Sequence, residues 1–130
     1  MSDNNYSIDF GYFFEGCTNL QTGCVFDNTV YVPLTYSSQA FAIAMYWGCT
    51  NLRESTIPPV GTTGNRMLES LFQNCTNLHK ITHNNSLPSL NYTGFSSGVG
   101  NTGDFYNLGG ATYTTGITGI PSGWTIHTSL

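Results

Sequence analysis

Cysteine and histidine are the residue types of this chain that are best suited to bind a metal ion or to act as nucleophiles. The sequence has four cysteines and three histidines. His79 and His83 are four residues apart, so that on a strand both side chains would lie on one face and could reach one ion. The sequence around them offers no third ligand. We therefore interpret both as exposed strand residues, and a metal pair stays the alternative.

Catalysis has little support in the sequence. The cysteine spacings match neither paired Cys-x-x-Cys zinc knuckles nor a Cys/His finger. The acidic residues show no closely spaced pair that would suggest a glycosidase. We expect no enzyme activity and no cofactor. A metal-dependent enzyme centred on His79 and His83 is the alternative of that class.

Three of the cysteines belong to a phrase that the chain repeats. Cys-Thr-Asn-Leu follows an aromatic-rich run each time, roughly 30 residues after the previous copy, which is typical of one coil of a repeat protein. The repeated structural positions are Cys17, Asn19, Leu20, Cys49, Asn51, Leu52, Cys75, Asn77 and Leu78. We expect the cysteines to stack as a column of buried free thiols and the asparagines to bond loop backbone. Cys24 lies outside the phrase and is the cysteine expected to be reactive.

Each copy of the phrase predicts the same succession of elements. The aromatic pair before it indicates a short helix or helical turn, whose left-handed end suits Gly16, Gly48 and Asn74. The residues after it indicate a short strand, most clearly residues 52–57 and 78–82.

A second repeated sequence feature divides the single domain, residues 1–130, into four units. An apolar residue precedes proline four times, at Val32-Pro33, Ile57-Pro58, Leu87-Pro88 and Ile120-Pro121. The approximate unit bounds are 10–40, 41–66, 67–102 and 103–130. The fourth unit lacks the cysteine, and residues 104–110 align with residues 70–76 if Gly109 takes its place.

These elements predict an α+β repeat protein. We expect a short leucine-rich-repeat solenoid of about four coils, each a helical turn plus a short strand, with capped ends. Trp124 and Ile126 alternate with polar residues and predict a final strand that covers the open end of the core.

Two insertions interrupt the repeat, residues 24–39 and residues 92–103. The second is rich in glycine and serine and predicts an exposed loop, and loops on a rigid scaffold are common sites of recognition. The candidate recognition residues are the aromatic ones, Tyr31, Tyr36, Tyr92 and Phe95. Packing over the ends of the coils is the alternative for the tyrosines.

The repeated phrase, followed by a strand and Ile-Pro, resembles the BspA-like class of leucine-rich repeats of bacterial, protist and phage-encoded proteins. The resemblance covers about residues 10–126, although the units here are longer, less regular and fewer than is usual in that family. It implies a non-enzymatic scaffold that adheres to host or matrix proteins. It supplies no catalytic residues.

Composition limits the partners. Charged residues make up 8% of the chain and the formal net charge is −4, so we expect neither nucleic acid nor a membrane as partner. No stretch approaches the roughly 20 apolar residues of a membrane span. The N-terminus lacks the cationic and apolar regions of a signal peptide.

Together these features predict a non-enzymatic structural and recognition module. We expect it at a virion surface or otherwise outside the cell, as a capsid decoration or fibre-associated protein with protein or glycan contacts. A bacterial cell-surface adhesin fragment is the alternative. Open strand edges predict self-association or docking onto an assembly lattice or a host surface partner.

Overall fold

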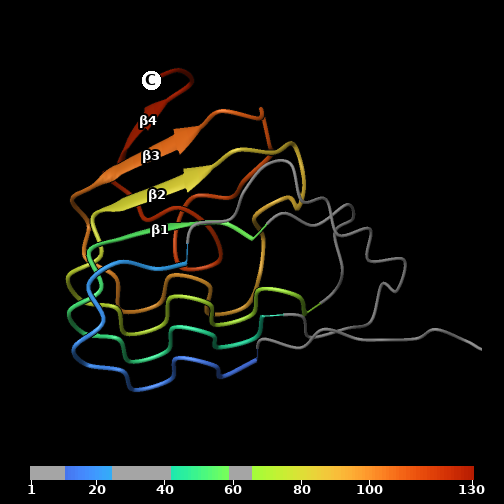
Figure 1. Cartoon of the computed structure of the whole chain (residues 1–130). Coiled ribbons are helices and arrows are strands. Elements are labelled where there is room, and N and C mark those ends of the chain that lie inside the picture. The colour runs from blue at the N-terminus through green and yellow to red at the C-terminus, as the bar shows by residue number, and fades with distance from the viewer. Residues whose placement is uncertain (1–10, 25–41, 59–65) are drawn as a thin grey trace, which may run out of the picture.

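The computed structural model describes residues 11–24, 42–58 and 66–130, and the statements below concern these residues. Their strands are β1 (Glu54–Thr56), β2 (Lys80–His83), β3 (Asp104–Asn107) and β4 (Thr125–His127). All four lie parallel in one sheet, in the order β1-β2-β3-β4 (Figure 1). Within the described residues, no helix is long and apolar enough to span a membrane.

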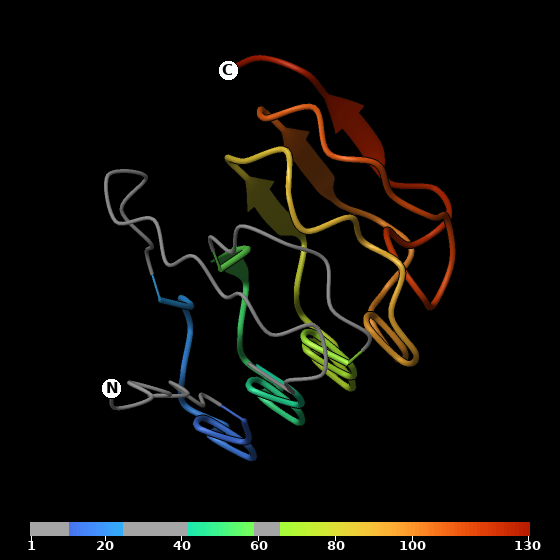
Figure 2. The same ribbon diagram turned by 90° about the vertical axis from the view of Figure 1, so that its right-hand side faces the viewer.

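Between strands the chain crosses to a second layer, which consists of turns. We call its parts the turn segments; they are residues 11–16, 42–48, 67–74 and 93–98. They lie side by side beneath the sheet (Figures 1 and 2). Alternate N–H groups of one segment donate to carbonyls of the next, as Phe14 does to Met45 (2.9 Å) and Tyr46 to Leu71 (3.0 Å). The turn layer is therefore a second hydrogen-bonded ladder.

The predicted α+β solenoid with a helical turn in each coil is wrong, because the described residues contain no helix and form a parallel sheet over turns. A helix needs an unbroken run of φ near −60°. Ala44 and Ser70 instead have φ of 52° and 56°, and a second positive φ follows four residues later. That second position is the one predicted to be left-handed, and φ values of 71°, 76° and 63° at Gly16, Gly48 and Asn74 confirm it.

The core lies between the sheet and the turn layer. Ile81 of β2 and Phe105 of β3 point inward and are fully buried. Below them the rings of Phe14, Tyr46 and Phe72 form a stacked column, with 5.6 Å between successive ring centres and ring planes within 10° of parallel. Equivalent residues of successive coils thus pack on one another.

Residues 104–110 do not lie where the sequence alignment places them. The alignment pairs them with residues 70–76 of the turn layer. In the structure, Asp104 is the sheet partner of Lys80. The alignment that puts Gly109 in the place of cysteine is therefore wrong.

Val99 is the residue that stands where the repeat has a cysteine. Its N–H donates to the Ser96 carbonyl at 3.0 Å, just as the Cys75 N–H donates to the Phe72 carbonyl at 3.0 Å. Residues 93–98 therefore form the turn segment of the coil that ends in β3. This coil crosses the predicted boundary between the third and fourth units.

The apolar-proline pairs do not mark equivalent places. Pro58 follows β1 closely, Pro88 lies further beyond β2, and Pro121 precedes β4, while Pro33 lies outside the described residues. A final strand forms as predicted, as β4. Of the two residues expected to cover the core, Trp124 is buried and Ile126 is 38% exposed, so the expectation for Ile126 is wrong.

Candidate functional site

The outward side of the sheet carries polar and aromatic side chains in two rows. Successive residues of a strand point to opposite faces, so Ile81 and His83 of β2 are buried while Lys80 and Thr82 are partly exposed. The register of the four strands gives the rows. We call them the outer sheet face: Glu54, Lys80, Asp104 and Thr125 in the first row, and Thr56, Thr82, Tyr106 and His127 in the second.

The outer sheet face gathers charges that are scarce in the chain. The whole sequence has three Lys and Arg residues and seven Asp and Glu residues. Glu54, Lys80 and Asp104 lie next to one another in the first row. A nearly uncharged protein therefore has one face with both signs of charge at close range.

Four side chains contact one another across β2, β3 and β4. Lys80 Nζ lies 5.2 Å from the centre of the Tyr106 ring, a cation–π contact. The His127 ring stacks on Tyr106, with 4.5 Å between ring centres and 13° between planes. His127 Nε2 lies 2.8 Å from Asp104 Oδ1, and because both side chains are a third to a half exposed the pair contributes at most about 1 kcal/mol. The contacts restrain all four side chains, so the face is preorganised.

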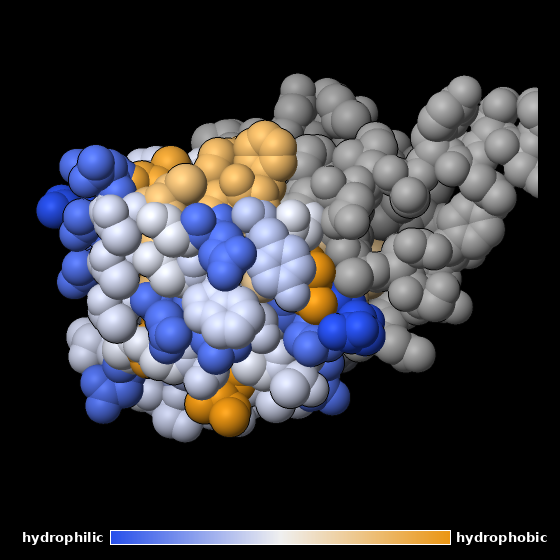
Figure 3. All heavy atoms as spheres, turned by 90° about the horizontal axis from the view of Figure 1, so that it is seen from below, coloured by the Kyte–Doolittle hydropathy of each residue, from blue (hydrophilic) through white to orange (hydrophobic). Residues whose placement is uncertain are grey.

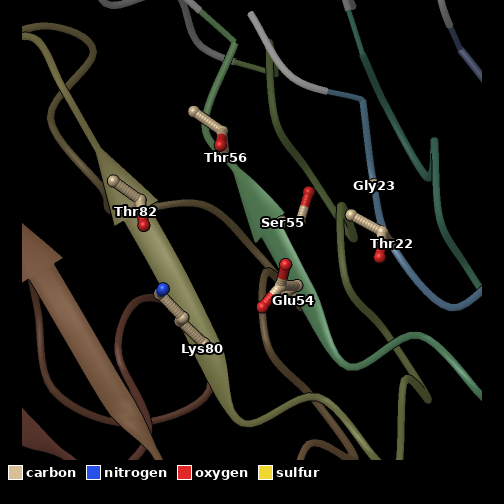
Figure 4. Close-up of a pocket in the computed structure, with 7 residues that line it drawn as sticks. All are labelled: Thr22, Gly23, Glu54, Ser55, Thr56, Lys80 and Thr82. Atoms are coloured by element: carbon tan, nitrogen blue, oxygen red, sulfur yellow. The ribbon is translucent and has the colours of Figure 1, made fainter.

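A shallow hollow of about 130 Å³ opens at the β1 end of this face (Figure 4). Its lining consists of Thr22, Gly23, Glu54, Ser55, Thr56, Lys80 and Thr82. It forms where residues 21–24 run beside β1, and there the Gly23 N–H donates to the Glu54 carbonyl (2.8 Å). A Cβ at Gly23 would lie 2.8 Å from the Ser55 Cβ and 3.0 Å from the Tyr46 hydroxyl oxygen, so this position needs glycine where the chain passes over the buried side chains next to β1.

The repeated cysteines connect neighbouring coils. The Cys49 thiol donates to the Phe14 carbonyl (Sγ···O 2.9 Å), and the Cys75 thiol donates to the Tyr46 carbonyl (3.0 Å). Burial, with a smaller contribution from the neighbouring Cys49, raises the pKa of the Cys75 thiol to about 12. The thiol therefore stays protonated and remains a donor.

The repeated asparagines make the same kind of connection at the surface. Asn51 Nδ2 donates to the Thr18 carbonyl (2.6 Å), and Asn77 Nδ2 donates to the Thr50 carbonyl (2.7 Å). Asn19 is exposed in the first described coil. The leucines of the phrase lie in or against the core, namely Leu20, Leu52 and Leu78.

Cys17 is exposed, so the expectation that it is buried is wrong. It belongs to the first described coil, and no earlier described coil offers a carbonyl to its thiol. Cys24 is half-buried, and its N–H donates to the Tyr46 hydroxyl oxygen (2.8 Å). All four cysteines are free thiols.

Tyr92 and Phe95 do not form a recognition loop, because both are buried. The Phe95 ring packs edge-on against Phe72, with ring centres 5.4 Å apart. The glycine- and serine-rich stretch is a turn segment of the core, and its glycines supply the positive φ that each turn segment needs. The other two candidates, Tyr31 and Tyr36, lie outside the described residues.

Residues 94–98, Gly-Phe-Ser-Ser-Gly, match the Gly-x-Ser-x-Gly pattern of a hydrolase nucleophile. Ser96 is buried, however, and its hydroxyl lies 2.7 Å from the Gly119 carbonyl and 3.1 Å from the Gly116 carbonyl. The Ser96 hydroxyl therefore donates to carbonyls of the following coil and connects the two coils. This serine is therefore part of the core and not a nucleophile.

His79 and His83 are not brought to one site. His79 precedes β2 and is exposed, but the expectation that His83 is exposed is wrong, because it is fully buried in β2. His83 Nε2 lies 2.9 Å from the Pro88 carbonyl, and burial lowers the pKa of His83. In the described part of the chain, no three His, Cys, Asp or Glu side chains lie close enough to hold a metal ion.

The sequence interpretation missed Asp104, Tyr106 and His127 as residues of one site. The available signal was alternation: residues 104–106 and 125–127 each place an apolar residue between two polar ones, as a strand with one outward polar face requires. Alternation shows that such a face exists, but not which strands are neighbours. The register supplies that information.

Comparison of the chain with family models, with curated proteins and with solved structures gave no match. The fold and the site therefore rest on the residues and contacts described above.

Proposed function

We propose that this chain is a non-enzymatic structural and recognition module that binds its partner through the outer sheet face. The observation that carries the proposal is the run of contacts from Lys80 through Tyr106 and His127 to Asp104. Side chains that are already ordered lose less conformational entropy on binding. Aromatic and charged side chains are also the groups that most often dominate binding energy.

The opposite side of the molecule supports this choice of surface. Figure 3 views the turn layer from below and shows mostly hydrophilic and intermediate residues around a few separated hydrophobic patches. Residues of the turn segments are tied into backbone ladders between coils. The turn layer thus serves as a scaffold for the sheet.

We place the module at a virion surface, as a capsid decoration or fibre-associated protein, with a BspA-like cell-surface adhesin as the alternative. The low charge supports contact with proteins or glycans, because few charges mean weak long-range attraction to charged polymers. Self-association belongs to the proposal, since β4 is the last strand of the described sheet and an edge strand can pair with another chain. Capsid and tail genes beside the coding sequence would support the virion placement, and an upstream export or anchoring sequence would contradict it.

The test of the binding face is a comparison of variants in biolayer interferometry against purified surface glycoproteins, matrix proteins and glycans. Lys80→Glu and Tyr106→Ser remove contacts on the outer sheet face, and we expect each to weaken binding about tenfold, which corresponds to about 1.4 kcal/mol. Glu15→Gln changes one exposed carboxylate at the turn layer and should bind like the wild type. Equal binding by all four proteins would show that the outer sheet face is not the binding site.

A further inference from the structure

The hollow at the β1 end of the outer sheet face is lined by groups that form hydrogen bonds. Thr22, Thr56 and Thr82 each contribute a hydroxyl, which both donates and accepts. Glu54 contributes a carboxylate that only accepts, and Lys80 an ammonium that only donates. Figure 4 shows that these side chains come from three neighbouring segments of the chain. The lining therefore offers both kinds of hydrogen-bonding group from several directions.

Glu54 and Lys80 face each other on neighbouring strands but do not form an ion pair. They are direct partners in the register of β1 and β2. The ion pairs of the described residues lie elsewhere, and Lys80 Nζ is held over the Tyr106 ring. The carboxylate and the ammonium are thus both available to a molecule in the hollow.

The two opposite charges select against charged ligands. An anion that approaches Lys80 is repelled by Glu54, and the net charge of −4 disfavours it further. A cation that approaches Glu54 is repelled by Lys80. A neutral molecule with several hydroxyl groups can accept from the ammonium and donate to the carboxylate at once. An apolar ligand finds no aliphatic or aromatic residue in the lining beyond the threonine methyl groups.

We infer that this hollow binds a neutral sugar residue of a glycan. The inference rests on the proposed function, because it names the ligand class for one part of the outer sheet face. Tyr106 and His127 act as positioning residues for Lys80, because the ammonium of this lining residue lies over the Tyr106 ring, on which His127 stacks. The chemical class is set by Glu54, Lys80 and the threonine hydroxyls.

The experiment titrates the full chain with sugars and follows backbone amides by NMR. The neutral probes are lactose, maltose and N-acetylglucosamine oligomers, and 3′-sialyllactose is the acidic counterpart of lactose. We expect at least one neutral sugar to shift the amides of Thr22, Glu54 and Thr82, and sialyllactose to bind about tenfold more weakly than lactose if lactose is the ligand. Acidic sugars that bind more tightly than neutral ones would overturn the inference.

Matched variants locate the site. Glu54→Gln and Thr82→Val should each weaken neutral-sugar binding about tenfold, whereas Glu15→Gln and Thr76→Val, both outside the hollow, should not. Circular dichroism at the titration temperature confirms that each variant is folded. Glu54→Gln should also narrow the difference between sialyllactose and lactose, because it removes the repulsion of the anion. Neutral-sugar binding that is unchanged in Glu54→Gln and Thr82→Val would place the site elsewhere and reject the inference.

The proposed function and this inference can fail separately. If no sugar binds, but a protein partner binds and Lys80→Glu abolishes that binding, the sugar inference is wrong and the outer sheet face is still the binding surface. If a neutral sugar binds in the hollow, but Tyr106→Ser weakens the binding of no protein partner, the sugar inference is supported and the proposed binding role of the wider outer sheet face is wrong.

Discussion

Repeated side chains join the coils that end at β1 and β2, whereas different side chains join the coils that end at β3 and β4. In the first pair, Tyr46 and Phe72 stack face to face, and the Cys75 thiol bonds to the carbonyl of Tyr46. In the next coil the place of Phe72 is taken by Ser96, whose hydroxyl bonds to the Gly119 carbonyl (2.7 Å). An apolar contact has been replaced by a hydrogen bond, and the last coil also takes a different path, because the N–H groups of Tyr92 and Ser96 donate to Thr118 and Ile117 and do not continue the regular ladder.

Asparagine side chains also form different bonds in the two regions. Asn77 is exposed and makes one hydrogen bond, to the Thr50 carbonyl of the preceding coil. Asn107 is buried, and its side chain both donates to the Ala111 carbonyl (2.8 Å) and accepts from the Ala111 N–H (3.0 Å). Asn77 thus joins two coils, whereas Asn107 ties β3 to the chain that directly follows it.

The largest effect should come from the aromatic column. Phe72→Ala leaves a cavity between Tyr46 and Phe95 and should lower the free energy of unfolding by about 3–5 kcal/mol in urea titrations. Ser96→Ala, at the equivalent position, should cost about 1–3 kcal/mol, because it leaves carbonyl groups without a donor. Equal losses in the two variants would mean that the two regions do not differ in this way.

A smaller effect should come from overpacking near the C-terminal end. Gly103→Ala places a Cβ 2.6 Å from the Trp124 ring and 2.8 Å from the His79 carbonyl, and should cost about 1–3 kcal/mol. Gly100→Ala is the control, because its Cβ would lie 3.9 Å from the nearest atom. Thermal unfolding of both variants measures the difference. A Gly103→Ala protein as stable as the control would show that Trp124 can move at little cost.

Asparagine substitutions compare the regions directly. Asn107→Ala removes two bonds and leaves the buried Ala111 amide and carbonyl without partners, which should cost about 1–3 kcal/mol. Asn77→Ala removes one bond at an exposed site and should cost about 0.5–1.5 kcal/mol. Chemical denaturation ranks the two variants, and a larger loss in Asn77→Ala would contradict the expectation that the buried Asn107 bonds contribute more to stability.

The smallest effect is a pH dependence from His83. Burial lowers the pKa of His83 in the folded state. Below the unfolded pKa of about 6.5 the unfolded state therefore binds more protons than the folded state, and the free energy of unfolding decreases as the pH is lowered. One such group gives a slope of about 1.4 kcal/mol per pH unit between the unfolded and folded pKa values. Unfolding free energies between pH 7 and pH 5 measure it. His83→Gln should flatten the slope, while His79→Gln, at an exposed position, should leave it unchanged.

Local preferences in the sequence were enough to place several features. Strand positions followed from short alternating runs, as β1 and β2 show. The left-handed residues Gly16, Gly48 and Asn74 followed from the residue types that tolerate positive φ. These features depend mainly on a residue and its immediate neighbours.

The candidate site was not predictable in the same way. Lys80, Tyr106 and His127 lie on three strands that are distant in sequence, and only the parallel register brings them into contact. Tyr92 and Phe95 fall in a stretch whose composition indicates an exposed loop, yet both are buried, and Phe95 packs against Phe72 of the neighbouring coil. Burial depends on what packs against a residue, which composition does not encode.

By itself, the sequence determined that a phrase repeats, where β1, β2 and β4 form and that Gly16, Gly48 and Asn74 take positive φ, because these are properties of short segments. Only the tertiary structure decided that the segments between strands are turns and not helices, because alternate N–H groups find their acceptors on the next coil, as Phe72 does on Phe95. It also decided which side chains meet on the outer sheet face. Both outcomes depend on hydrogen-bond partners that are far away along the chain.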